Sequence, residues 1–273
     1  MTLHESKHSG YNELSRHGRL HQPSAAPEGL ALYRYADLGS ADFAEPLARL
    51  AEPEPWGEGA LRDYLEQTFE RLSRSGQIAI SADNGFSAFN TGLGTPLQET
   101  IYGLFLRNHV QGGPPWQLSG WLPDGDRALL DRFPEPPPQA VYAQAPADYV
   151  YDGRRELHVM PKELLATSEN LTVLPGPLRS NPYQAGLVLE GAVRRVQARV
   201  RRSHRAAVPG WDPATERLQL LLPLALTNPD TVDVALAVVP DGEAAYRGVA
   251  VLPLDLAYAR ARLVGRPAEW LTN

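Results

Sequence analysis

Apolar residues recur with the period of an α-helix in one segment of the N-terminal half. In ALRDYLEQTFERLSRSG, Leu61, Leu65, Phe69 and Leu72 are spaced i, i+4, i+8 and i+11, which places them on one face of a helix. Gly76 follows as a natural stop signal. We therefore expect an amphipathic helix that ends near Gly76 and packs this apolar face against the core.

Alternating apolar and polar residues predict a hairpin directly after this helix. The segment QIAISADNGFSAFNTGL, residues 77–93, holds two alternating runs joined by Asp83-Asn84-Gly85. Asn-Gly accepts positive φ at low cost, so this is the strongest hairpin signal in the chain. The runs IYGLFLRNHV and WQLSGWL follow and are expected to be further strands.

The last third of the chain has the clearest pattern. Residues 183–205 are expected to form a long helix entered after Asn181, with Pro182 in its first turn. The runs RLQLLLPLAL, VDVALAVV and YRGVAVLPL, separated by turn residues, predict an antiparallel meander, and LDLAYARARLV a closing helix. The fold class is therefore α+β, with antiparallel hairpins and a C-terminal three-stranded meander packed against two or three helices.

Two stretches bear on domain organisation. Residues 1–28 are polar and end in the turn-rich QPSAAPEG, so we expect a disordered tail. Residues 133–146 hold five prolines and resist any helix. We expect one α+β domain over residues 29–273, with 133–146 as its candidate subdomain boundary; ELHVM and PKELLATS beyond it predict a short strand and a short helix.

Composition excludes several classes of protein. The 273 residues are 43% apolar and include no cysteine, which rules out disulfides, thiolate catalysis and cysteine-bound metal centres. No window approaches the ~18 uninterrupted apolar residues of a membrane span, and the N-terminus lacks the apolar core of a secretory signal. We expect a soluble, cytoplasmic protein without a membrane partner.

Positive charge is concentrated in one stretch of a chain whose formal net charge is −6. Residues 192–211, AVRRVQARVRRSHRAAVPGW, contain six arginines, one histidine and no carboxylate. On a helix, Leu189, Val193, Val196 and Val200 would face the core, and the arginines would lie on the opposite side. Because no acid occurs from Gly191 through Trp211, we expect no i,i+4 ion pairs there. The six arginines are Arg194, Arg195, Arg199, Arg201, Arg202 and Arg205.

Three explanations of this arginine face remain open. It is a solvated helix face whose last turn is favoured by the helix dipole, it is neutralised by acidic side chains from elsewhere in the chain, or it binds a phosphate-bearing ligand.

Several stretches also carry a family resemblance. They are FNTGL, PLQETIYGLF, NPYQ, RRVQARVRRSHRAAVP, LQLLLPLAL and LPLDLAYARARL, in that order from about residue 30 onward. The chain resembles a bacterial family known as domain of unknown function 3825. Members are often joined to LOTUS-type winged helices or cold-shock domains, which implies an RNA-related or stress-related role. The sequence shows no such module, and it has Ala259-Arg260-Ala261-Arg262 where the family is rich in asparagine.

Signatures of the common enzyme classes are absent from the sequence, including Walker A, Rossmann and metalloprotease motifs. The candidate catalytic residues are His204, which lies beside the arginines, and Asn90 and Glu99, which flank apolar runs. Asn90 and Asn181 have the alternative role of turn and cap residues. We expect no metal site, since histidines and acids are not grouped with common ligand spacing, and no cofactor.

Three functions follow as hypotheses. The first is binding of RNA or single-stranded nucleic acid, with the arginines on phosphates and Tyr183, Trp211 or Phe86 stacking on bases. The second is a nuclease or nucleotide hydrolase in which the same arginines stabilise transition-state charge. The third is a protein–protein scaffold with an acidic partner. A deep cavity joining Asn90, Glu99, His204 and the arginines would favour catalysis, and an open basic surface would favour binding.

Overall fold

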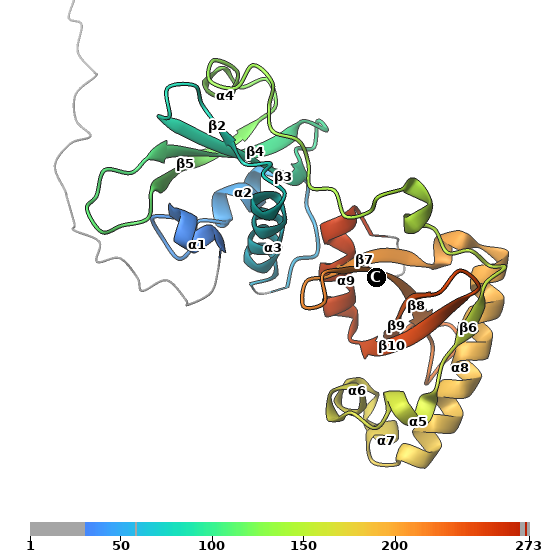
Figure 1. The fold of residues 1–273 in the computed structure, drawn as a ribbon. Helices are drawn as coiled ribbons and strands as arrows, with labels where there is room; N and C mark the ends of the chain where they lie inside the picture. Colours follow the sequence, from blue (N-terminus) through green and yellow to red (C-terminus); the bar gives the residue numbers. More distant parts are fainter. Residues whose placement is uncertain (1–30, 58, 268–270, 272–273) are drawn as a thin grey trace, which may run out of the picture.

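The computed structural model describes residues 31–57, 59–267 and 271, and it contains two five-stranded sheets, each with its own helices. The proline-rich stretch 133–146 connects the two sheets, as Figure 1 shows. The α+β class with antiparallel hairpins is confirmed. The expected tail, residues 1–28, lies outside the described residues.

The first sheet has the strand order β1-β5-β4-β3-β2 and is antiparallel except where β1 pairs with β5. The hairpin prediction is confirmed, because β2 pairs antiparallel with β3 across a turn in which Asn84 adopts a φ of 56°. Strand β2 is much shorter than the alternation suggests. The strands are β1 Ala36–Asp37, β2 Ala79–Ile80, β3 Phe86–Gly94, β4 Thr100–Arg107 and β5 Trp116–Pro123.

Helix α3, Ala60–Arg74, packs on one face of this sheet. The predicted apolar face, Leu61, Leu65, Phe69 and Leu72, is buried throughout, and Phe69 meets Phe89 of β3 edge-on at 5.2 Å between ring centroids. Short helices α1 (Ala31–Tyr35) and α2 (Glu45–Leu50) flank α3, and α4 (Arg127–Leu130) covers the opposite face of the sheet. Both faces of the central strands are therefore buried.

Close packing in this sheet makes Gly103 of β4 intolerant of a side chain. A Cβ at Gly103 would lie 2.5 Å from Cε1 of Phe89 and 2.9 Å from Cζ3 of Trp121, both of which are buried rings. We expect Gly103→Ala to lower the free energy of unfolding by about 1–3 kcal/mol, measured by urea denaturation. Gly120→Ala on β5 is the matched control, since its Cβ would meet nothing within 4 Å. Equal losses in both variants would contradict this explanation.

The second sheet has the order β6-β10-β9-β8-β7 and contains the predicted meander as β8-β9-β10. Strand β6 adds to one edge in parallel with β10, as the run ELHVM predicts a strand there. Strand β7 at the other edge was not predicted, because its residues belong to the arginine-rich stretch. The strands are β6 Glu156–His158, β7 Val208–Asp212, β8 Arg217–Leu224, β9 Val234–Asp241 and β10 Ala245–Leu252.

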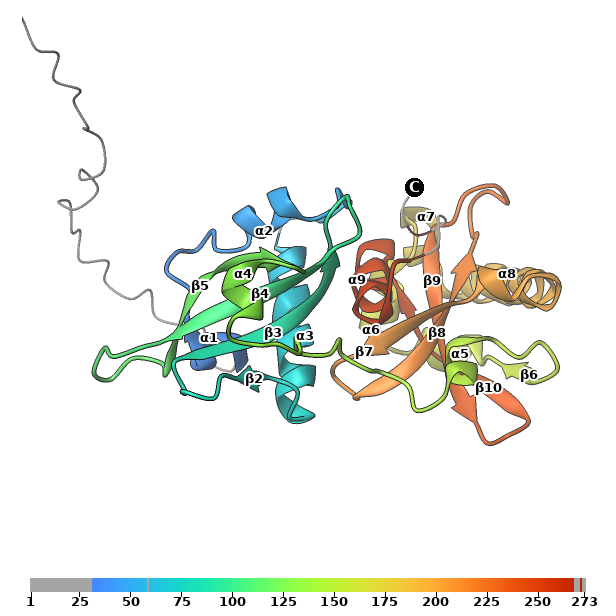
Figure 2. The ribbon, with the colours of Figure 1, turned by 90° about the horizontal axis from the view of Figure 1, so that it is seen from above.

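Two helices cover opposite faces of the second sheet, α8 (Pro182–Arg202) on the outer side and α9 (Leu254–Val264) on the side toward the first sheet, as Figure 2 shows. Alternate side chains of β8 point to opposite faces of the sheet. Leu220 and Leu222 join the core beneath α8, and Leu221 joins the core beneath α9. Burial on both faces explains why β8 reads as an unbroken apolar run. Small helices α5 (Pro161–Leu164), α6 (Ser168–Val173) and α7 (Gly176–Arg179) pack beside α8 and β10.

Helix α9 also joins the two sheets through a buried ion pair. Nε of Arg262 lies 2.7 Å from Oε2 of Glu54, and the hydroxyl of Tyr258 donates to the same oxygen at 2.8 Å. Nη2 of Arg262 reaches the carbonyl of Gly92 on β3 at 3.3 Å. Burial, followed by the hydrogen bond to Glu54, raises the pKa of Tyr258 well above its usual value. The two sheets therefore meet through a satisfied charged network.

Candidate nucleic-acid interface

Helix α8 begins where the sequence predicts and ends earlier than predicted. The side chain of Asn181 accepts a hydrogen bond from the backbone N–H of Gln184 at 3.1 Å, so Asn181 is an N-cap. The helix ends at Arg202, because Ser203 has an extended backbone and residues 204–206 form a 3₁₀ turn that leads into β7. The expected helix over 183–205 is therefore wrong at its C-terminal end.

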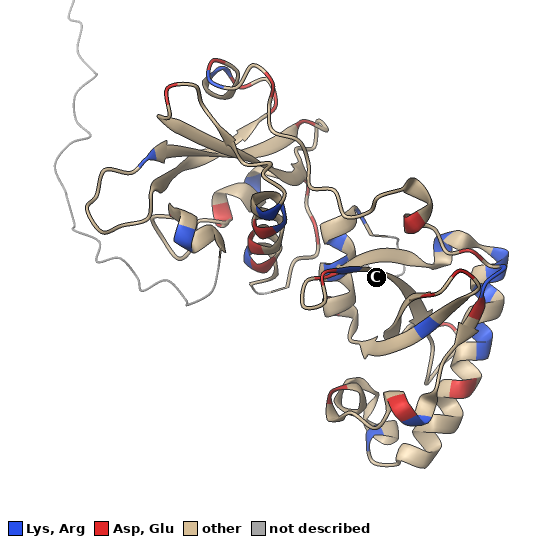
Figure 3. Cartoon of the chain, viewed as in Figure 1, with Lys and Arg blue, Asp and Glu red and all other residues tan. Residues whose placement is uncertain are grey.

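The arginine-rich helix is amphipathic as predicted. Leu189, Val196 and Val200 are buried against the second sheet, whereas Val193 is only partly buried. All six arginines of the stretch are exposed, and Figure 3 shows the basic positions of α8 concentrated toward its C-terminal end. The separation of an apolar face from a basic face follows directly from the helical period.

Two of the six arginines have partners within the chain. Nη2 of Arg194 lies 2.6 Å from Oε1 of Glu190 in an i,i+4 ion pair. The expectation that no such pair forms is wrong, because Glu190 immediately precedes the acid-free stretch. Nη2 of Arg195 donates to the backbone carbonyl of Ala225 at 2.8 Å.

The remaining four arginines form what we call the arginine surface: Arg199, Arg201, Arg202 and Arg205. No carboxylate oxygen in the described parts of the chain lies within 4.0 Å of their guanidinium nitrogens. The acidic side chains that the structure describes thus neutralise one member of the six-arginine cluster, Arg194, and leave the arginine surface without an ion-pair partner of its own.

A loop adds one further arginine beside this surface. Gly153 packs so closely that a Cβ there would lie 3.4 Å from Cα of Arg201. The exposed Arg154 follows it and hydrogen-bonds Asp152 at 2.9 Å, which lowers the pKa of Asp152 to about 2. Arg155 instead stacks on Tyr246, with Cζ 4.2 Å from the ring centroid. Sequence reasoning missed Arg154, although the Arg-Arg pair after Gly153 was a visible signal.

The aromatic candidates differ in accessibility. Tyr183 is 79% exposed in the first turn of α8 and is free to stack on a base. Trp211 is only 8% exposed on β7, with Tyr142 and the guanidinium of Arg71 packed against its ring. Base stacking by Trp211 is therefore ruled out by burial. Phe86 is covered by Arg132, whose Cζ lies 4.1 Å from the ring centroid.

The candidate catalytic residues do not come together. His204 is exposed just after the end of α8, whereas Asn90 is on β3 of the first sheet and Glu99 is in the loop between β3 and β4. Asn90 donates to the carbonyl of Pro137 at 3.3 Å and accepts from the backbone N–H of Gly92 at 2.9 Å, which is a turn role. Glu99 accepts from Thr95 Oγ1 at 3.2 Å. In the described part of the chain, these residues therefore do not line one cleft with the arginines.

Within the part of the chain that the structure describes, no three His, Asp or Glu side chains lie close enough together to hold a metal ion. None of the helices described there has the length and apolar character that a membrane span requires.

Comparison with known proteins identifies the family of the chain. A family model described as a domain of unknown function (DUF3825) matches residues 47–270. The match begins within α2 and extends past α9, so it covers the second sheet and every strand of the first sheet except β1. Comparisons with curated proteins and with solved structures gave no match. Because the family model covers most of its length, the chain belongs to the DUF3825 family.

Proposed function

We propose that this protein binds RNA or another single-stranded nucleic acid through the arginine surface. The observation that carries the proposal is the grouping of four exposed arginines within seven residues, none of which has a carboxylate partner among the described residues. Like charges at adjacent helical positions repel each other, and the fold does not neutralise this repulsion between the arginines. An anionic ligand bound there would reduce it. Guanidinium groups match phosphate oxygens with two parallel hydrogen bonds.

The shape of the site favours binding over catalysis. The arginines are exposed on α8 and in the turn after it. His204 lies beside them, but the other two candidates for catalysis, Asn90 and Glu99, lie on β3 and in the loop between β3 and β4 of the first sheet. Contacts to phosphates supply affinity that does not depend on base sequence. Tyr183 offers a stacking surface, and it lies about 24 Å along the helix axis from Arg199 at 1.5 Å per residue. A ligand that uses both groups must therefore be several nucleotides long.

Salt dependence tests the proposal on the unmodified protein. We expect a fluorescein-labelled 20-nucleotide oligouridylate to bind with an affinity that falls steeply as salt rises. If each residue of the arginine surface contacts one phosphate, the slope of log K against log salt should be about −3, from about −0.7 per phosphate. Fluorescence anisotropy measures this slope directly.

An acidic polypeptide of equal charge is the control for this titration. Polyglutamate binding as tight as the binding of RNA would support the acidic-partner hypothesis instead. RNA binding that is absent, or insensitive to salt, would refute the proposal.

A further inference from the structure

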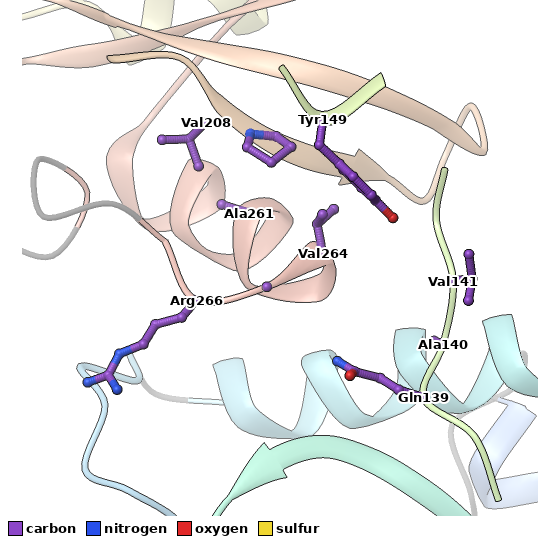
Figure 4. A pocket seen from close by; sticks show the side chains of 10 residues that line it. Gln139, Ala140, Val141, Tyr149, Val208, Ala261, Val264 and Arg266 are labelled. Atoms are coloured by element: carbon purple, nitrogen blue, oxygen red, sulfur yellow. The ribbon is translucent and has the colours of Figure 1, made fainter. Parts of the chain in front are cut away.

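A hollow of about 370 Å³ lies where the connection between the sheets passes α9 and β7 (Figure 4). This volume falls within the range of roughly 300–1,000 Å³ that small-molecule sites occupy, and such sites often lie between structural units. The hollow is separated from the arginine surface by the second sheet, because α9 and α8 cover opposite faces of that sheet. Any ligand bound here is independent of the proposed function of α8.

The walls of the hollow are mainly apolar. Val208 and Pro209 of β7 and Ala261 and Val264 of α9 form one side, and the connection supplies Ala140 and Val141. Aliphatic side chains and a proline ring make broad contact with a flat ring system, which is attracted to them because both surfaces leave water. The chemistry of the walls therefore fits an uncharged planar ligand.

Three polar side chains line the hollow, Gln139, Tyr149 and Arg266, and Arg266 is already paired with Glu52 at 2.8 Å. Figure 4 shows Gln139 extending toward its centre beneath α9, and Tyr149 entering from the other side. The hydroxyl of Tyr149 accepts a hydrogen bond from the backbone N–H of Ala143 at 3.1 Å, which leaves its own O–H free to donate. No hydrogen bond to the Gln139 carboxamide is found among the described residues.

From this geometry we propose that the hollow binds an adenine base. A carboxamide presents one N–H donor and one C=O acceptor side by side, and adenine presents the matching pair, the acceptor N7 and the amino group on C6. The flat ring would lie between the apolar walls while Gln139 hydrogen-bonds this edge. Unsubstituted purine has the same ring system without the amino group, so it offers Gln139 only ring-nitrogen acceptors and can form only one of the two bonds.

Isothermal titration calorimetry of the full chain with adenosine tests this site. Adenosine carries no charge, so the arginine surface contributes nothing to its binding. We expect saturable binding of adenosine, and binding of purine riboside, which lacks the amino group, about tenfold weaker, which corresponds to the loss of one hydrogen bond and the burial of an unpaired group. Gln139→Ala should weaken adenosine binding about tenfold and abolish the preference over purine riboside.

Two further variants complete the test. Gln144→Ala removes an exposed carboxamide from the same connection outside the hollow, and it should leave binding unchanged. Val264→Trp should fill the hollow and abolish binding, with circular dichroism reporting whether the variant folds. Absence of saturable adenosine binding in the millimolar range, or equal binding by Gln139→Ala and the unmodified protein, would overturn the proposal. Arg199→Glu with Arg202→Glu should not alter adenosine binding, so failure at one site is distinguishable from failure at the other.

Discussion

Replacing Arg199 and Arg202 by glutamate is expected to weaken binding of single-stranded RNA by at least about 100-fold at low salt while the protein stays folded. Each substitution removes a hydrogen-bonded contact to a phosphate, worth about 1.5–3 kcal/mol, and adds a repulsive charge. Both side chains are exposed and, among the described residues, make neither an ion pair nor a hydrogen bond that the fold needs. Arg195 is a poorer choice, since it holds the carbonyl of Ala225.

The matched control reverses two exposed arginines of the first sheet unit, Arg34 and Arg127. They lie on α1 and α4, far from α8 (Figure 3), and the net charge changes by the same amount. We expect this control to retain most of the RNA affinity, because only long-range attraction is reduced. Equal losses in the two double variants would show that net charge, and not the arginine surface, governs binding. Unfolding of the α8 variant would show that Arg199 and Arg202 serve the fold.

Breaking the buried ion pair between Glu54 and Arg262 is expected to destabilise the protein by about 3–5 kcal/mol. The two side chains are only 8% and 7% exposed, so Arg262→Met leaves the carboxylate of Glu54 buried and uncompensated except for Tyr258. Urea denaturation of the variant measures the loss. The Arg262 guanidinium also lies over the rings of Tyr64 and Trp56, at 5.2 and 6.0 Å from their centroids, so methionine is chosen to retain part of this packing.

Two further variants separate the effect of burying the charges from the effect of pairing them. Arg266→Met breaks the exposed pair with Glu52 and should cost less than about 1 kcal/mol. Glu54→Leu combined with Arg262→Met removes both charges, and it should be more stable than Arg262→Met alone. A cost for Arg262→Met no larger than that for Arg266→Met would contradict the assignment of this pair as the charged link between the sheets.

Local sequence signals were sufficient for the elements that depend on near neighbours. The face formed by Leu61, Leu65, Phe69 and Leu72, the turn at Asn84, and the N-cap at Asn181 each rest on contacts within a few residues. The same holds for the basic face of α8, because helical geometry alone separates its arginines from Leu189 and Val200. The candidate nucleic-acid interface was therefore largely predictable.

Tertiary structure decided which residues lie close together across long sequence separations. The sequence predicts Trp211 as a stacking residue, but β7 places it beneath Arg71. Asn90 and Glu99 lie on β3 and in the loop that follows it, whereas His204 lies in the turn after α8. The partner of Arg262 is Glu54, more than two hundred residues away, and the hollow beside Gln139 exists only because the connection crosses α9. Such pairings depend on how whole sheets pack, and periodicity along the chain carries no information about them. The sequence by itself determined the long helices α3, α8 and α9, the hairpin at Asn84, the meander and the basic face, whereas burial, charge pairing and the hollow were decided by packing between the two sheets.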